Sequence, residues 1–221
     1  MLRILMAGLL TAMVAGCGYA SDVDLAPMSE RIPKRIVSTG DYCEAAIAKP
    51  YTVKSSDDCM RLEWNQQARS YTVFEPGDDD PPVVVAIAPL GPDIYLAQVT
   101  DPANNPGGRY NVSLVLAKGS ALLSLPRLAS ERLAEVAKRH PGVTLRKSGS
   151  DAIIANGSRA DIRLFLRATI AEALRGADLD DADIAVVVRD TGGAADHLAN
   201  AVQSRDISYL LTALRRLQPT D

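Results

Sequence analysis

The apolar residues of this chain change their spacing at Pro126, and this change constrains the fold more than any other feature. From about residue 42 to 125 they occur in short runs that turn residues separate, such as the run at 83–88 before Gly91. Short strands joined by short turns are typical of an antiparallel meander that curls into a sandwich or a small barrel. After Pro126 the spacing becomes helical. We therefore expect an α+β fold, with an antiparallel β meander followed by a helix-strand-strand-helix region.

Two tight hairpins are expected within the meander. The polar turn at 65–67 separates two aromatic runs, so Trp64 and Tyr71 should face each other across the first pair of strands. Such a pair either lines a groove for a sugar or peptide or, as is more usual, builds the core. The Lys-Gly turn at 118–119 is typical of a second hairpin.

The helical region carries clear boundary signals. Pro126 precedes the first helix, and the His-Pro-Gly turn at 140–142 ends it. Ser158 is a candidate N-cap of the second helix, with Asp161 three residues later. The buried stripe of this second helix should comprise Ile162, Phe165, Leu166, Thr169, Ile170, Ala173 and Leu174. Further on we expect two strands between these helices, then a strand at 184–188, a short helix at 194–202 and a longer helix at 206–217.

The first seventeen residues differ from the rest of the chain. Residues 1–3 carry one positive charge, residues 4–13 carry no charge and no proline, and the uncharged run ends at Val14-Ala15-Gly16-Cys17. A basic start before an apolar run of this length is typical of an export signal. The run is shorter than the about 20 apolar residues that a transmembrane helix needs.

The sequence Val14-Ala15-Gly16-Cys17 resembles the lipobox of bacterial prolipoproteins. In that family the cysteine thiol receives a diacylglyceryl group, the leader is cut before it, and the new amine is usually acylated. The resemblance implies that Cys17 carries the lipid, with an ordinary cleaved signal as the alternative. Because two or more acyl chains make a stable anchor, the mature chain should be held on a membrane of the bacterial cell envelope, facing the periplasm. Gly18, where an aspartate would favour the inner membrane, favours the outer membrane.

The three cysteines divide into one and two. With Cys17 lipidated, Cys43 and Cys59 remain as a pair in an oxidising compartment. We predict a disulfide between them, which closes a loop of about 16 residues. A metal or redox pair is the alternative, but the spacing is not CxxC and no histidine lies near.

Residues 17–40 are predicted to form a lipidated tether, because Gly, Pro, Ser and Asp interrupt any periodicity there. Within it, Arg31, Lys34 and Arg35 either touch anionic headgroups or, since Glu30 lies among them, form a solvated charge cluster. The expected organisation is a signal peptide at 1–16, the tether at 17–40, an antiparallel β module at 41–126 and an α/β helical region at 127–221.

Composition and motifs exclude several classes of function. The full chain has 24 basic and 27 acidic residues, and removal of Arg3 with the leader leaves a net charge of −4. This balance offers no basic excess for binding nucleic acid. The sequence contains no GxSxG nucleophile elbow, no phosphate-binding GxxxxGK[ST] and no HExxH zinc motif. We therefore expect no nucleic-acid partner, no cofactor and no metal.

The remaining candidates for chemistry each have a simpler interpretation. His140 and His197 are the only histidines, and His140 is expected in a helix-ending loop, as a surface or capping residue. The acidic run at 78–80 precedes two prolines and indicates a solvated turn more than a calcium site. The acidic run at 178–183 resembles part of an EF-hand loop but lacks the required glycine and glutamate, so we interpret it as a charged linker.

These observations predict a membrane-anchored envelope lipoprotein that acts as a non-catalytic structural or protein-interaction module, with an envelope protein as partner and no catalytic residue assigned. One alternative is a lipoprotein that binds a small apolar or lipid ligand. Another is a hydrolase with an unrecognised site around His140 or His197. The ligand-binding alternative predicts a cavity in the β part that is lined by Val84, Ile94, Val112 and Leu114.

Overall fold

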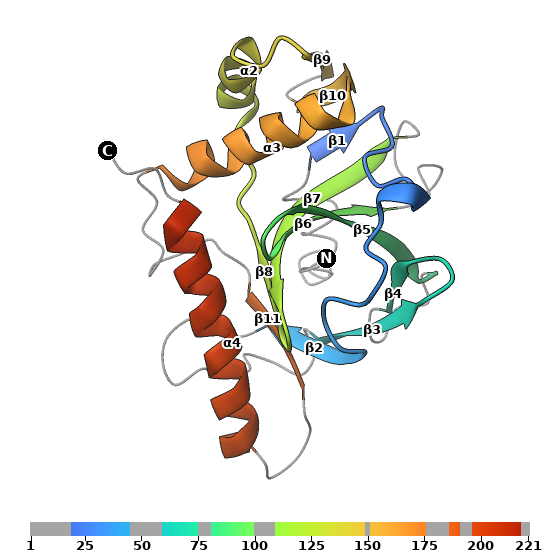
Figure 1. Ribbon diagram of the computed structural model, residues 1–221, viewed down its shortest axis with the longest axis vertical. Helices are drawn as coiled ribbons and strands as arrows, with labels where there is room; N and C mark the ends of the chain where they lie inside the picture. The colour runs from blue at the N-terminus through green and yellow to red at the C-terminus, as the bar shows by residue number, and fades with distance from the viewer. Residues whose placement is uncertain are drawn as a thin grey trace, which may run out of the picture.

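Eight antiparallel strands form a closed barrel (Figure 1). The computed structural model describes residues 19–44, 59–74, 81–99, 109–148, 151–175, 186–190 and 196–217. The strand β6 pairs with both β5 and β7, and β11 lies between β8 and β2, so every barrel strand has two neighbours. The barrel strands are β2 (Gly40–Glu44), β3 (Cys59–Asn65), β4 (Ser70–Phe74), β5 (Val83–Gly91), β6 (Ile94–Val99), β7 (Tyr110–Lys118), β8 (Ala121–Ser124) and β11 (Val186–Arg189).

Three further strands extend the sheet away from the barrel. The strand β1 (Tyr19–Ser21) pairs in antiparallel orientation with the first residues of β7. On its other side β1 pairs in parallel orientation with β10 (Asp151–Gly157). The strand β9 (Val143–Ser148) pairs with β10 and forms the edge of this outer sheet. The N-terminal part of the described chain therefore joins the barrel to the hairpin of β9 and β10.

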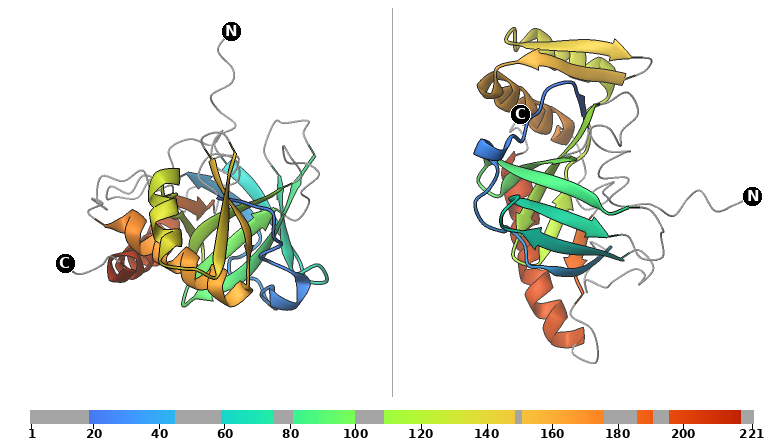
Figure 2. Two further views of the ribbon diagram at one scale, coloured as in Figure 1. Left: turned by 90° about the horizontal axis from the view of Figure 1, so that it is seen from above. Right: turned by 90° about the vertical axis from the view of Figure 1, so that its right-hand side faces the viewer.

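The helices cover the outside of these sheets (Figure 2). Both α2 (Ser130–Lys138) and α3 (Arg159–Leu174) pack against the β9–β10 hairpin, and α4 (Asp196–Leu217) packs along β7, β8 and β11 of the barrel. A short 3-10 helix, η2 (Met28–Glu30), follows β1. The predicted α+β class, the β meander and the helix-strand-strand-helix order are confirmed, and the meander takes the form of a barrel.

Local predictions in the β part are also confirmed. Trp64 and Tyr71 are cross-strand partners in the β3–β4 hairpin, with ring centroids 4.9 Å apart. Cys43 and Cys59 are cross-strand partners in β2 and β3 and form a disulfide. Gly119 turns the chain between β7 and β8 with a φ of 58°, a left-handed conformation that favours glycine.

The helix boundaries agree with the predictions in one case and differ in another. The Ser158 hydroxyl accepts a hydrogen bond from the Asp161 N–H at 3.2 Å and caps α3 as expected. The two helices predicted at 194–202 and 206–217 are instead one helix, α4. Residues 203–205 between them contain neither glycine nor proline, so nothing in the sequence ends the helix there. The predicted strand at 184–188 corresponds to β11, of which residues 186–189 are described.

The predicted tether at 17–40 differs from the structure over its described part. Residues 19–40 pack against the body of the protein, and Tyr19 in β1 is 2% exposed. Proline, glycine and aspartate interrupt any hydrophobic period in this segment, but its backbone groups form hydrogen bonds with distant parts of the chain. For example, the Ile32 N–H donates to the Ile87 carbonyl, and the Asp22 N–H donates to the Ile154 carbonyl. A segment without a regular spacing of apolar residues is therefore not necessarily a solvated linker.

The apolar side chains form two clusters on opposite sides of the barrel wall. One fills the barrel interior. The other lies between the outer face of the barrel and the helices, and it combines residues of β6, β7 and β8 with residues of α2, α3 and α4. This outer cluster crosses the predicted boundary at residues 126 and 127, so the β module and the helical region share a core.

Candidate functional site

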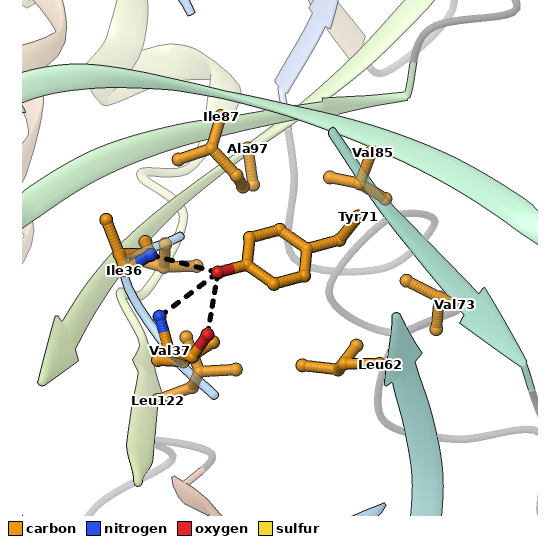
Figure 3. A pocket seen from close by; sticks show the side chains of 10 residues that line it. Ile36, Val37, Leu62, Tyr71, Val73, Val85, Ile87, Ala97 and Leu122 are labelled. Carbon is orange, nitrogen blue, oxygen red and sulfur yellow. Dashed lines mark hydrogen bonds between the residues drawn. The ribbon is translucent and has the colours of Figure 1, made fainter. Parts of the chain in front are cut away.

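The barrel encloses a small apolar cavity (Figure 3). Its volume is about 50 Å³. An apolar cavity of about 150 Å³ stays dry and holds benzene, so the present one is too small for a ring of that size. The lining consists of apolar side chains and Tyr71, namely Ile36, Val37, Leu62, Tyr71, Val73, Val85, Ile87, Ala97, Val115 and Leu122.

The chain itself closes one mouth of the barrel. Residues 31–39, which we call the plug segment, cross the end where the β3–β4 and β7–β8 turns lie. The Gln66 side chain donates to the Pro33 carbonyl at 2.9 Å, and Val37 forms an isolated bridge with Gly119. Ile36 and Val37 thereby enter the interior and become part of the cavity wall.

The Tyr71 hydroxyl holds the plug segment inside the mouth (Figure 3). It accepts hydrogen bonds from the N–H groups of Ile36 and Val37 at 2.9 and 3.1 Å, and it donates to the Val37 carbonyl at 2.9 Å. Burial raises the pKa of Tyr71, because desolvation disfavours the phenolate. The hydroxyl therefore stays protonated and keeps its role as a donor.

The cavity lining predicted from the sequence is wrong. Three of its four residues, Ile94, Val112 and Leu114, belong to the cluster between the barrel and the helices, and Val84 is exposed. The true lining residues are the neighbours of these in sequence, such as Val85 and Val115. Successive side chains of a strand point to opposite faces, so an error of one residue reverses inside and outside. Both faces of these strands are apolar because helices cover the outer one.

Two serine hydroxyls face the interior away from the plug segment. Ser113 lies two residues from Val115 on β7, and Ser124 lies two residues from Leu122 on β8. Val115 and Leu122 line the cavity, and residues two apart on a strand share a face, so both serines point into the barrel. Ser113 and Ser124 are 2% and 5% exposed, and neither hydroxyl has a hydrogen-bond partner among the described residues. A buried hydroxyl without a partner costs free energy, so these two serines are unfavourable for stability as they stand.

A second hollow lies on the outside, between α3, the end of α4 and the β5–β6 turn. Its volume is about 260 Å³, and Arg167 supplies its charged group. The Arg167 Nε donates to the Leu90 carbonyl at 2.6 Å, which joins α3 to the barrel. The hollow is lined by Gly91, Pro92, Ile94, Arg167, Ile170, Ala171 and Leu217.

An ion cluster joins α2 to α3 near the end of α3. Arg132 donates to the Glu172 carboxylate at 2.8 Å, and Arg139 and Arg175 lie within 3.6 Å of the same carboxylate. The hydrogen bond from Arg132 lowers the pKa of Glu172. Because all partners are salt-bridged on the surface, we assign this cluster to helix packing.

Among the described side chains, which include that of His140 but not that of His197, no recognisable catalytic grouping occurs. The half-buried His140 ring lies edge-on to Phe165, with centroids 5.9 Å apart, and contributes to packing. His197 belongs to α4. Cys17 and the acidic runs at 78–80 and 178–183 lie outside the described residues. Among the described residues, no cluster of His, Cys, Asp or Glu could hold a metal, and no helix has the length and apolar character needed to cross a membrane.

Comparison with known proteins finds no match: no family model, no curated protein and no solved structure matches this chain. The geometry alone therefore carries the functional argument. The features that sequence reasoning missed are the plug segment and the role of Tyr71. The apolar pair Ile36-Val37, which lies between Pro33 and Gly40 in an otherwise polar stretch, was the signal for them.

Proposed function

We propose that this chain is an envelope lipoprotein, held on the membrane through Cys17, that acts as a non-catalytic protein-interaction module. The observation that carries the proposal is the small size of the barrel cavity: the plug segment closes one mouth, and the cavity that the described residues line has a volume of about 50 Å³. A partner therefore has the outer surfaces of the barrel and helices available to it. The disulfide between Cys43 and Cys59 supports an oxidising compartment, where such bonds persist.

The anchor is tested by the variant Cys17→Ala. We expect the wild-type protein to sediment with membranes and the variant to move to the soluble fraction, because the acyl chains supply the attachment. The control is Lys34→Gln, which removes an exposed charge of the plug segment and should leave the protein with the membranes. A Cys17→Ala protein that still sediments would exclude the lipid anchor.

The interaction role is tested in intact cells. Crosslinking followed by purification of the chain should recover the same envelope protein repeatedly. Recovery of unrelated proteins that change from one preparation to the next would contradict this role.

A second candidate function is the binding of a small apolar ligand in the barrel. It is favoured by the wholly apolar wall of the cavity and by the unpartnered Ser113 and Ser124 hydroxyls at the inner face. A barrel of eight strands has an interior that is either filled by side chains or takes one small ligand. At its present volume the cavity admits only a group smaller than benzene, so a larger ligand would require the plug segment to move.

Xenon binding distinguishes the ligand-binding function from the protein-interaction function, because small apolar cavities bind xenon. If the cavity is accessible, xenon should shift the methyl NMR signals of Ile87, Val115 and Leu122. The variant Ala97→Leu adds bulk to the wall and should abolish these shifts, whereas Leu164→Ala on the exposed face of α3 should not. Mass spectrometry of solvent extracts from the native protein should then reveal a co-purifying apolar molecule that Ala97→Leu lacks. Absence of both signals removes the ligand-binding candidate.

A further inference from the structure

We propose that the start of β1, together with the neighbouring residues 145–148 of β9 and 151–153 of β10, lies against the bilayer surface. The inference rests on the proposed lipid anchor at Cys17 and deepens it. Gly18 is the one residue between Cys17 and β1. Because a chain spans at most about 3.6 Å per residue, the Cα atoms of Cys17 and Tyr19 are within about 7 Å of each other. An anchored chain of this fold has no free length with which to stand clear of the membrane.

The strand β1 is firmly part of the fold. It has a hydrogen-bonded neighbour on each side, β7 and β10. The buried Tyr19 hydroxyl donates to the Thr169 hydroxyl at 3.2 Å and accepts from the Leu128 N–H at 3.3 Å. The strand therefore connects the barrel, α3 and the segment before α2, and its release would break contacts with all three. The anchor must act on the folded body.

The register of β1 identifies the part of the body nearest the anchor. Ala20 pairs with Ile153, which places Tyr19 level with Ala152, one residue from the end of the β9–β10 turn. The hairpin lies at one end of the long axis of the molecule (Figure 1). Because the chain reaches β1 at this level, the described surface that the anchor brings to the bilayer includes the end of β9 and the start of β10, next to Lys147 and Ala152.

The charges at this surface suit a bilayer with anionic headgroups. Arg146 and Lys147 on the edge strand are exposed and lie level with Ile153 and Ala152, close to the start of β1. Basic residues near a membrane surface are attracted to anionic lipids. In contrast, Arg31 binds the carbonyls of Ala26 and Ala68, at the plugged mouth of the barrel.

The test compares hydrogen exchange of the full lipidated chain on vesicles of phosphatidylethanolamine and phosphatidylglycerol with that of the soluble Cys17→Ala protein. We expect several-fold slower exchange at residues 145–148 and 151–153 on the vesicles and unchanged exchange in β3 and β4. A second variant carries about 15 Gly and Ser residues between Cys17 and Gly18, a linker that spans about 20 Å, beyond two Debye lengths. It should still sediment but should exchange at the rate of the soluble protein. The same linker placed after Asp221 is the control and should leave the protection unchanged.

Three outcomes would contradict the proposal. If the wild-type chain sediments but the hairpin shows no protection, the anchor stands and the proposed surface is wrong. If β1 exchanges faster on vesicles than in solution, the strand is released as a tether and the proposal also fails. If the wild-type chain does not sediment at all, the anchoring at Cys17 fails, and the membrane surface fails with it.

Discussion

Replacement of Phe165 by alanine is expected to lower the free energy of unfolding by about 4 kcal/mol, within the usual range for truncating a buried aromatic side chain. Phe165 lies on α3 and is 0% exposed, in the apolar cluster that joins the helices to the outer face of the barrel. Its loss removes packing on both sides of this boundary and the ring contact with His140. The measurement is a urea titration that follows the fluorescence of Trp64, the only tryptophan.

Trp64 lies in β3, remote from Phe165 in the sequence, which makes the result informative about cooperativity. If the barrel and the helices unfold as one unit, Trp64 should report the full loss of stability. If the helical signal in circular dichroism disappears before the Trp64 transition, and that transition is unchanged, the shared core does not couple the two parts. The control is Leu164→Ala, one residue away and 56% exposed, which should change stability by less than about 0.5 kcal/mol.

The variant Tyr71→Phe is expected to cost about 3 kcal/mol, because each buried polar group left without a partner costs about 1–3 kcal/mol. The substitution keeps the ring and removes the hydroxyl that binds two N–H groups and one carbonyl of the plug segment. The loss is measured by urea titration. Hydrogen exchange of Ile36 and Val37 should accelerate by a larger factor than exchange in the barrel strands.

The matched control for this variant is Tyr209→Phe. The Tyr209 hydroxyl also donates a hydrogen bond, to Asp93, but on the exposed surface of α4. Water replaces such a partner, so this loss of stability should be clearly smaller than that of Tyr71→Phe. Equal losses for the two variants would show that the Tyr71 hydroxyl does not hold the plug segment.

Element types were predictable wherever local signals agree with one another. The Ser158 cap and the buried stripe from Ile162 to Leu174 define α3, and the observed buried residues of that helix match six of the seven expected. The turn at Lys118-Gly119 was readable because its glycine adopts a left-handed conformation. In each case the residues that decide the structure lie within a few positions of one another.

The candidate site was less predictable, because its residues come from segments far apart in the sequence. The cavity lining was placed one residue out of register, since helices bury the outer face of β5, β6 and β7 and make both faces apolar. The plug segment lies within the predicted tether, because an irregular segment that packs against another part of the chain has no periodic pattern of its own. Its partners, Tyr71 and Ile87, are 34 and more residues away.

The sequence by itself determined the α+β class, the hairpins, the cysteine pair that the structure joins, and the expectation of a lipid anchor at Cys17. These follow from short-range chemistry: turn residues, helical spacing, caps and a local motif. Only the tertiary structure decided that the meander closes into a barrel, that residues 31–39 fill its mouth, and that β1 begins two residues after Cys17. Closure and filling depend on which faces are covered by distant segments, and that is a property of packing.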